Sequence, residues 1–123
     1  MAAIRDIVVD CSHPASVARF WAAVLDDYAV APYTEEELAR IGGDPENDPS
    51  VLVEPAGDGP RFFFVLVPEA KTVKNRLHLD LRAEDFDAEL DRLIGLGAMV
   101  FADLPEWTVL QDPEGNEFCL LKN

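Results

Sequence analysis

One histidine of the chain lies in a pattern that could support acid–base chemistry. His78 belongs to the stretch Arg76–Arg82, in which polar residues and leucines strictly alternate. The alternation predicts a β-strand whose leucines face a helix-side core and whose other face carries Arg76, His78 and Asp80. A carboxylate near a histidine raises the histidine pKa and suits it to proton transfer near neutral pH. A histidine between leucines is also common as a hydrogen-bonded cavity-wall residue, and both interpretations of His78 stand.

A second predicted strand, residues 4–11, carries acidic residues on one face. Asp6 and Asp10 share this face because their positions differ by four, an even number. A strand that lines a ligand cavity would have this pattern, and so would a solvent-facing edge strand. The two cysteines, Cys11 and Cys119, are most simply reduced core thiols. Cys119 has no lysine or arginine next to it, so nothing local favours a reactive thiolate.

Composition argues against two classes of partner. The 123 residues include 10 basic and 24 acidic side chains, for a net charge of −14. This charge disfavours nucleic acid and anionic membranes as partners. The first residues do not resemble a signal peptide, and no apolar run reaches the ~20 residues of a membrane span. We therefore expect a cytoplasmic protein whose length fits a single domain, residues 1–123.

Two amphipathic helices are predicted between the strands. The first begins at Pro14, a favourable first helical residue, and ends near residues 26–27. The second spans Ala83–Leu96 and ends at Gly97. Their apolar residues recur at helical spacing, which predicts burial: Val17, Phe20, Trp21, Val24 and Leu25 in the first helix, and Phe86, Leu90, Leu93 and Ile94 in the second.

Turn sequences predict two β-hairpins. Asp112–Asn116 lies between two short apolar runs, residues 107–110 and 118–121. A similar acid-Pro-x-Gly sequence, Glu54–Gly57, joins residues 51–53 to residues 61–67. Residues 31–50 are irregular, although Thr34 and Glu37 predict a capping box at the start of a short helix. This stretch is either a functional lid or a plain insertion.

The order strand, helix, strand, hairpin occurs twice, in residues 4–67 and in residues 76–121. Residues 68–75 connect the two copies, and Asp6 in the first copy corresponds to His78 in the second. A unit of this kind cannot close a core alone, so the repeat predicts an α+β fold built from two modules.

The repeat and three motifs resemble the glyoxalase-like branch of the vicinal oxygen chelate superfamily. The motifs are Lys74–Leu81, Asp112–Cys119 and the helix with Phe20–Trp21. The superfamily includes glyoxalase I, extradiol dioxygenases, methylmalonyl-CoA epimerase and the bleomycin and fosfomycin resistance proteins. The resemblance implies two paired βαβββ modules that form a curved mixed sheet around a concave cavity.

The resemblance also implies site positions. Metal-using members carry ligands on the first and last strand of each module, which here fall at Asp6, His78, Cys119 and, in the first module, at or near Val65. Because one position is apolar and one is a thiol, we expect no metal and no other cofactor. A divalent ion on Asp6, His78 and Cys119 is the alternative.

The expected site therefore rests on acid–base groups and a small-molecule cavity. We expect His78 and Asp6 to be catalytic, and four residues to bind substrate: Arg76, Asp80, Trp107 and Cys119. Trp107 fits an apolar cavity wall as well as it fits simple packing.

Three functions compete for this chain. The first is a small-molecule enzyme of lyase, isomerase or dioxygenase type, and the second is a metal-free binding or resistance protein without turnover. The third is a structural module without ligand chemistry. The resemblance favours one of the first two, in a homodimer that binds neither nucleic acid nor membrane.

Overall fold

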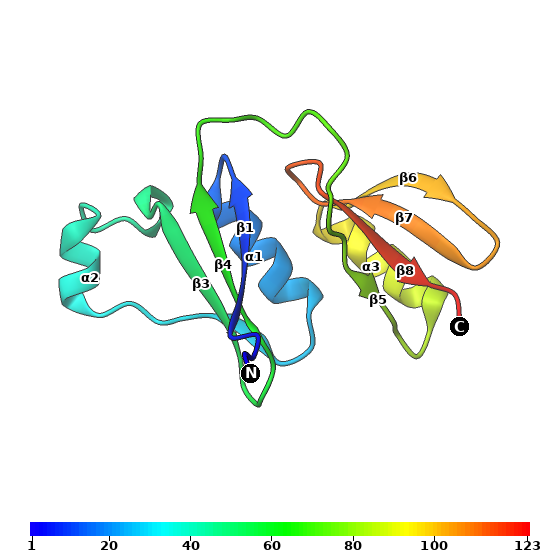
Figure 1. Ribbon diagram of the computed structural model, residues 1–123, viewed down its shortest axis with the longest axis horizontal. Helices are drawn as coiled ribbons and strands as arrows, with labels where there is room; N and C mark the ends of the chain where they lie inside the picture. The colour runs from blue at the N-terminus through cyan, green and yellow to red at the C-terminus, as the bar shows by residue number, and fades with distance from the viewer. The chain divides into compact units, whose positions relative to one another are not determined.

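Two compact units make up the chain, and each consists of a four-stranded sheet with α-helix on one side. The computed structural model describes residues 1–123, with the first unit at residues 1–70 and the second at residues 71–123 (Figure 1). The boundary lies inside the predicted connector 68–75. None of the α-helices combines the length and the apolarity needed to cross a membrane.

Unit 1 has a mixed sheet in the order β1-β4-β3-β2. β1 pairs with β4 in parallel, and the other neighbours are antiparallel. The elements are β1 (Asp6–Cys11), α1 (Pro14–Val24), β2 (Tyr28–Val30), α2 (Glu35–Arg40), the 3₁₀ turn η1 (Pro45–Asn47), β3 (Ser50–Pro55) and β4 (Arg61–Leu66).

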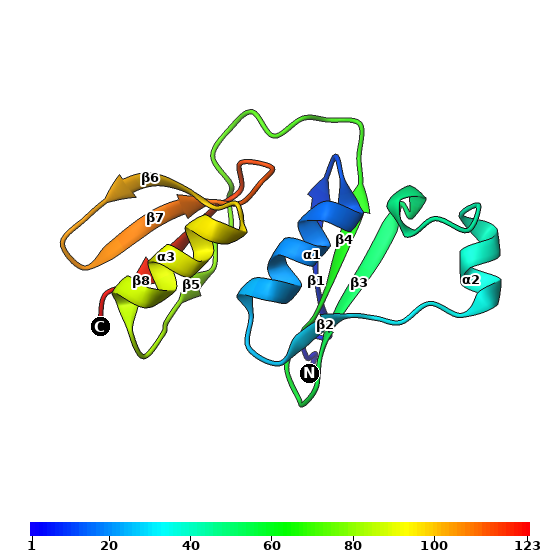
Figure 2. The ribbon, with the colours of Figure 1, turned by 180° about the vertical axis from the view of Figure 1, so that it is seen from behind.

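The core of unit 1 forms where α1 lies against its sheet (Figure 2). The predicted apolar stripe is buried except for Leu25, the C-cap, which is half-buried, and Phe20 contacts Trp21 edge to face with ring centroids 5.5 Å apart. From the sheet, β3 and β4 contribute alternate residues to the same core: Val51, Val53, Phe62 and Phe64. The opposite face of this sheet therefore carries the other alternating set, which includes Asp6 and Phe63.

The irregular stretch of unit 1 contains the predicted capped helix. Thr34 is the N-cap of α2, its hydroxyl accepts a hydrogen bond from the Glu37 N–H, and the Glu37 carboxylate accepts one from the Thr34 N–H. The capping box is thus confirmed. Figure 2 shows α2 on the long segment that connects β2 to β3.

Unit 2 repeats the topology of unit 1, with the sheet order β5-β8-β7-β6. β5 pairs with β8 in parallel, and the two remaining pairs are antiparallel. The elements are β5 (Asp80–Leu81), α3 (Phe86–Leu96), β6 (Met99–Asp103), β7 (Trp107–Gln111) and β8 (Glu117–Leu121). The predicted α+β fold of two βαβββ modules is confirmed.

The predicted strand Arg76–Arg82 is wrong in extent, because only Asp80 and Leu81 pair with β8. The partner strand begins at Glu117, and the Glu117 side chain accepts a hydrogen bond from the Asn75 N–H. At Asn75 the chain before β5 is therefore attached to a side chain of β8, and its one backbone hydrogen bond to β8 is from the Cys119 N–H to the Leu79 carbonyl. Leu77, predicted to be buried, is 68% exposed.

Helix α3 also differs from its prediction. It starts at Phe86, not at Ala83, because the Asp85 side chain caps it by accepting from the Ala88 N–H. Of the predicted apolar face only Leu93 is fully buried, and Ile94 is 46% exposed.

Leu93 is therefore expected to carry most of the attachment of α3 to its sheet. Replacing Leu93 with alanine should lower the free energy of unfolding by about 2–4 kcal/mol, because the truncation leaves a cavity. Ile94→Ala should cost less than about 1 kcal/mol. Urea unfolding followed by circular dichroism measures both, and equal losses would contradict this account of the core.

Candidate functional site

A cavity of about 380 Å³ lies on the sheet face of unit 2 that points away from the buried core residues. Alternate residues of β7 and β8 face it, whereas Thr108, Leu110, Phe118 and Leu120 face the core. We call it the unit-2 cavity. Its lining residues are Lys74, His78, Asp80, Trp107, Val109, Glu117, Cys119 and Leu121.

The turn between β7 and β8 fixes which residues face this cavity. Asp112 is 2% exposed, and its Oδ1 accepts hydrogen bonds from the Glu114 N–H and the Asn116 N–H, each at 2.9 Å. Its Oδ2 accepts a third from Asn116 Nδ2 at 3.0 Å. Gly115 takes the φ of +87° that this turn requires. The predicted hairpin is confirmed, and its turn sets the pairing of Val109 with Cys119.

His78, Asp80 and Cys119 form a polar cluster in the unit-2 cavity. His78 Nε2 lies 3.4 Å from Asp80 Oδ1, and possible ligand atoms of all three residues lie within 4.8 Å of one another. β5 provides Asp80, which lies opposite Cys119 of β8. Burial, the charge of Asp80 and a hydrogen bond with its side chain raise the pKa of the Cys119 thiol. Cys119 is therefore a protonated thiol near neutral pH and a weak hydrogen-bond donor.

The same cluster can be tested as a metal site. An imidazole, a carboxylate and a thiol are a mixed donor set that suits zinc, whereas manganese prefers oxygen donors. The cluster could thus hold zinc through His78, Asp80 and Cys119, where the ion would polarise a bound oxygen. Its side chains at His78 and Asp80 are 42% and 55% exposed, so it is not a closed structural site. The expectation of a metal-free protein stays a prediction.

Asp6, predicted to be catalytic, is engaged inside unit 1. Its carboxylate accepts hydrogen bonds from Arg61 Nε and Nη2 at 2.8 and 3.2 Å. The hydrogen bonds from Arg61 lower the pKa of Asp6. Arg61 also lies over the ring of Phe63, 5.3 Å from its centroid. Asp6 is therefore an ionised partner of Arg61, which does not suit it to donate a proton.

The strand registers also correct one predicted correspondence between the modules. Asp6 and His78 each lie eight residues before the helix of their unit, which begins at Pro14 or Phe86. Val8 then corresponds to Asp80, and the residue opposite Val8 is Phe63. The counterpart of Cys119 is therefore Phe63, not Val65. Neither Phe63 nor Val65 has a side chain that can bind a metal.

Of the two remaining predicted site residues, Trp107 lines the unit-2 cavity and Arg76 does not. Trp107 lines the unit-2 cavity with 38% of its surface exposed. Arg76 is exposed and is not among the lining residues. The alternation of Arg76–Arg82 placed both Arg76 and His78 on one strand face, but the strand does not extend back to Arg76.

Sequence reasoning missed a network around Glu117. Its carboxylate accepts hydrogen bonds from Lys71 Nζ at 3.0 Å and from the Asn75 N–H at 3.0 Å. The Asn75 side chain donates to Asn116 Oδ1. These bonds hold residues 71–75 against β8, and Lys74 within that segment lines the cavity. A polar connector has no periodicity that could have predicted these contacts.

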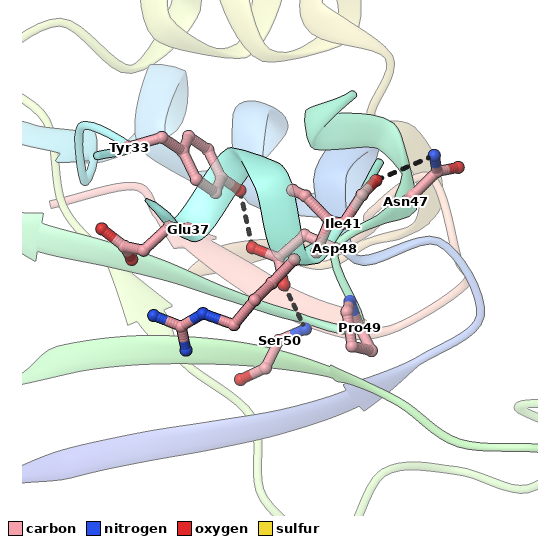
Figure 3. Close-up of a pocket in the computed structure, with 8 residues that line it drawn as sticks. Tyr33, Glu37, Ile41, Asn47, Asp48, Pro49 and Ser50 are labelled. Atoms are coloured by element: carbon pink, nitrogen blue, oxygen red, sulfur yellow. Dashed lines mark hydrogen bonds between the residues drawn. The ribbon is translucent and has the colours of Figure 1, made fainter. Parts of the chain in front are cut away.

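A second cavity, of about 630 Å³, lies in the irregular stretch of unit 1. Figure 3 shows the Tyr33 hydroxyl pointing at Asp48, to which it donates a hydrogen bond of 2.7 Å. Burial and this carboxylate raise the pKa of Tyr33, so the hydroxyl stays protonated. Asp48 also accepts from the Ser50 N–H, and Asn47 donates to the Ile41 carbonyl. These polar groups bond to one another within the loop. This cavity is therefore a weaker candidate for a functional site than the unit-2 cavity.

Comparisons with known proteins cover nearly the whole chain. The family model described as a glyoxalase-like domain matches residues 6–121. No curated protein sequence matches the chain.

Solved structures show the same fold at low sequence identity. The fosfomycin resistance protein FosX from Mesorhizobium loti matches with a TM-score of 0.69 and 13% identity, over 100% of this chain and 93% of that one. A glyoxalase/bleomycin resistance protein/dioxygenase family enzyme from Burkholderia phytofirmans PsJN matches with a TM-score of 0.68 and 14% identity, over 97% of each chain. A glyoxalase/bleomycin resistance protein from Albidiferax ferrireducens T118 matches with a TM-score of 0.61 and 18% identity, over 98% of each chain.

The Glu117 network yields a prediction about pH. Burial on its own raises the pKa of Glu117, but the hydrogen bonds from Asn75 and Lys71 outweigh it and lower the pKa below the ordinary 4.5. The stabilisation is therefore complete above pH 4.5 and is lost as the pH falls through the lowered pKa. Glu117→Gln should cost about 1–2 kcal/mol of unfolding free energy near pH 7.

Urea unfolding between pH 3 and pH 7 measures this effect. The difference between the original protein and Glu117→Gln should shrink as the pH falls below 4.5, because protonation of Glu117 removes its charge. Glu106→Gln, at an exposed position of the same unit, serves as the control and should differ little at any pH. A difference for Glu117→Gln that is independent of pH would contradict the ionic role.

Proposed function

Because the chain belongs to the glyoxalase-like domain family, we propose that its unit-2 cavity binds a small molecule on which His78 and Asp80 act as an acid–base pair. The observation that carries this proposal is the 3.4 Å approach of His78 Nε2 to Asp80 Oδ1 in a cavity with an apolar wall. The reaction belongs to the lyase or isomerase type, because proton transfers alone cannot carry out the dioxygenase reaction that the resemblance also implies.

The wall of the cavity supports a ligand with an apolar part. Trp107, Val109 and Leu121 face the cavity from β7 and β8. A volume near 380 Å³ is at the lower end of small-molecule sites, about 300–1,000 Å³. A ring or a short acyl chain against Trp107 would bring its polar end towards His78 and Asp80.

The proposed chemistry requires that a bound molecule can reach His78, whose side chain is exposed. A neutral imidazole can accept a proton from a bound molecule through one nitrogen, while the Asp80 carboxylate stabilises the imidazolium that forms. The same imidazolium can then return the proton to another atom of the bound molecule. Cys119 lies opposite Asp80 in the strand pair, with its sulfur within 4.8 Å of the carboxylate, where it can help to orient the acid–base pair. This sequence of proton transfers does not require a metal, and we propose that the protein works without one.

A binding protein without turnover is the second candidate. The apolar wall favours it, since apolar contacts supply affinity without any reacting group. The matched resistance proteins make this role worth testing, although their names describe those proteins alone.

The first experiment compares the two histidines of the chain. His78→Ala and Asp80→Asn should abolish ligand-dependent stabilisation or turnover while changing the unfolding free energy by less than about 1 kcal/mol, because both side chains are largely exposed. His13→Ala is the matched control, since it removes the same ring at the start of α1. A thermal-shift screen of small aldehydes, carboxylates, phosphonates and aromatic compounds, followed by turnover assays, measures these effects.

The outcomes separate the candidates. Turnover that His78→Ala removes supports the acid–base role, and stabilisation without turnover supports the binding protein. Stoichiometric zinc in protein purified without added metal would overturn the metal-free proposal. A His78→Ala variant that is strongly destabilised yet binds normally would show that His78 is only a wall residue.

We also propose that the protein is a cytoplasmic homodimer. β6 is an edge strand of its sheet, and three consecutive residues on it are exposed apolar side chains: Met99, Val100 and Phe101. Unpaired edges with apolar side chains favour association. Light scattering at micromolar concentration should give twice the mass of the 13.6 kDa chain. Phe101→Lys should shift the particle towards the monomer, and a monomeric original protein would refute the proposal.

A further inference from the structure

One exposed lysine, Lys74, lines the unit-2 cavity without a hydrogen bond or an ion pair. We propose that Lys74 recognises an anionic group on the ligand, so the ligand is a small anion with an apolar body. This inference rests on the proposed function, because it specifies which small molecule the unit-2 cavity accepts.

The charges that line the cavity are otherwise paired. Asp80 faces His78, and Glu117 is bound by Lys71 and by the Asn75 N–H. Lys74 makes no hydrogen bond and no ion pair. An ammonium group that lines a cavity without a partner gains the most from an anionic ligand, since no existing pair has to be broken.

Lys74 is also held near the cavity by its neighbours. Lys71 and Asn75, on either side of it in sequence, both bind the Glu117 carboxylate, and Lys71 additionally donates to the Val73 carbonyl. The backbone around Lys74 is therefore fixed to β8 before a ligand arrives. Restricting this segment in advance reduces the ordering cost that binding would otherwise include.

Lys74 and the polar cluster line the same cavity. Burial and Asp80 raise the pKa of Cys119, and the charge of Lys74 opposes them. An anionic group near Lys74 would thus lie beside Cys119 and the acid–base pair, while the apolar body extends along Trp107 and Leu121.

The charge of Lys74 and the net charge of the whole chain favour ligands of opposite sign. The chain as a whole carries −14, which repels anions at long range and would suit a cationic ligand. At the cavity, however, Lys71 neutralises Glu117, Asp80 faces His78, and the charged group without a direct partner is the cation Lys74. The local arrangement decides the ligand class because contacts at a few ångströms outweigh screened charges farther away.

The experiment uses four probes that share a ring and differ in their head group. Phenylacetate and benzylphosphonate are anionic, phenylacetamide is neutral and phenethylamine is cationic. Nuclear magnetic resonance titrations of the full chain, following the indole signal of Trp107, give a dissociation constant for each probe. The variants are Lys74→Ala, Lys74→Arg and, as the control, Arg82→Ala, which removes a cation at an exposed position outside the cavity lining.

We expect the original protein to bind phenylacetate or benzylphosphonate about fivefold more tightly than phenylacetamide, the size of a partly exposed charge pair. Lys74→Ala should remove this preference without changing the affinity for phenylacetamide. Lys74→Arg and Arg82→Ala should keep it, and about 0.3 M sodium chloride should weaken it. The relative affinities of the two anions then show whether the site prefers a carboxylate or a phosphonate.

Three results would overturn the inference. If phenylacetamide or phenethylamine bound as well as the anions, the cavity would bind small molecules but Lys74 would not select among them, and the proposed function would survive. If none of the probes perturbed Trp107 and the thermal-shift screen also found no ligand, the proposed function itself would fail. A loss of affinity for all probes alike in Lys74→Ala would assign Lys74 a structural role instead.

Discussion

The candidate site of unit 2 depends on the buried carboxylate of Asp112. Its three hydrogen bonds define the turn between β7 and β8, and the turn defines the register of the two strands. Because side chains alternate along a strand, a slip by one residue would direct Cys119 into the core and Phe118 into the cavity. The chemistry of this face therefore follows from a polar group that takes no part in it.

The two units use the same topology for different surfaces. Where unit 2 has the polar cluster of His78, Asp80 and Cys119, the corresponding positions of unit 1 are Asp6, Val8 and Phe63. Asp6 is neutralised by Arg61, and the other two are apolar. A duplicated fold thus supplies two equivalent sheet faces, of which one retains groups that can exchange protons.

Sequence periodicity correctly predicted helices whose pattern depends on contacts within the helix. It overestimated the length of β5, because the length of a strand also depends on the neighbouring strand. Two features depend only on residues of a single helix: the capping box of Thr34 and Glu37, and the apolar stripe of α1. The spacing of residues in the sequence is enough to predict such features. A strand needs a second strand, and alternation cannot report that β8 reaches back only to Glu117. For the same reason His78 and Asp80 were recognised as a pair, whereas the role of Glu117, whose partners lie more than 40 residues away in sequence, was not.

The shortness of β5 has a consequence for how the site fluctuates. Just before its two paired residues, the Leu79 carbonyl accepts from the Cys119 N–H, and this is the only backbone hydrogen bond between residues 76–79 and β8. The amide hydrogens of residues 76–79 are therefore expected to exchange with solvent at lower opening free energies than the amides of β7. His78 lies on this weakly paired segment of unit 2. A ligand that engages it must first order that segment, and the resulting protection from exchange would report occupancy of the cavity without any assay of chemistry.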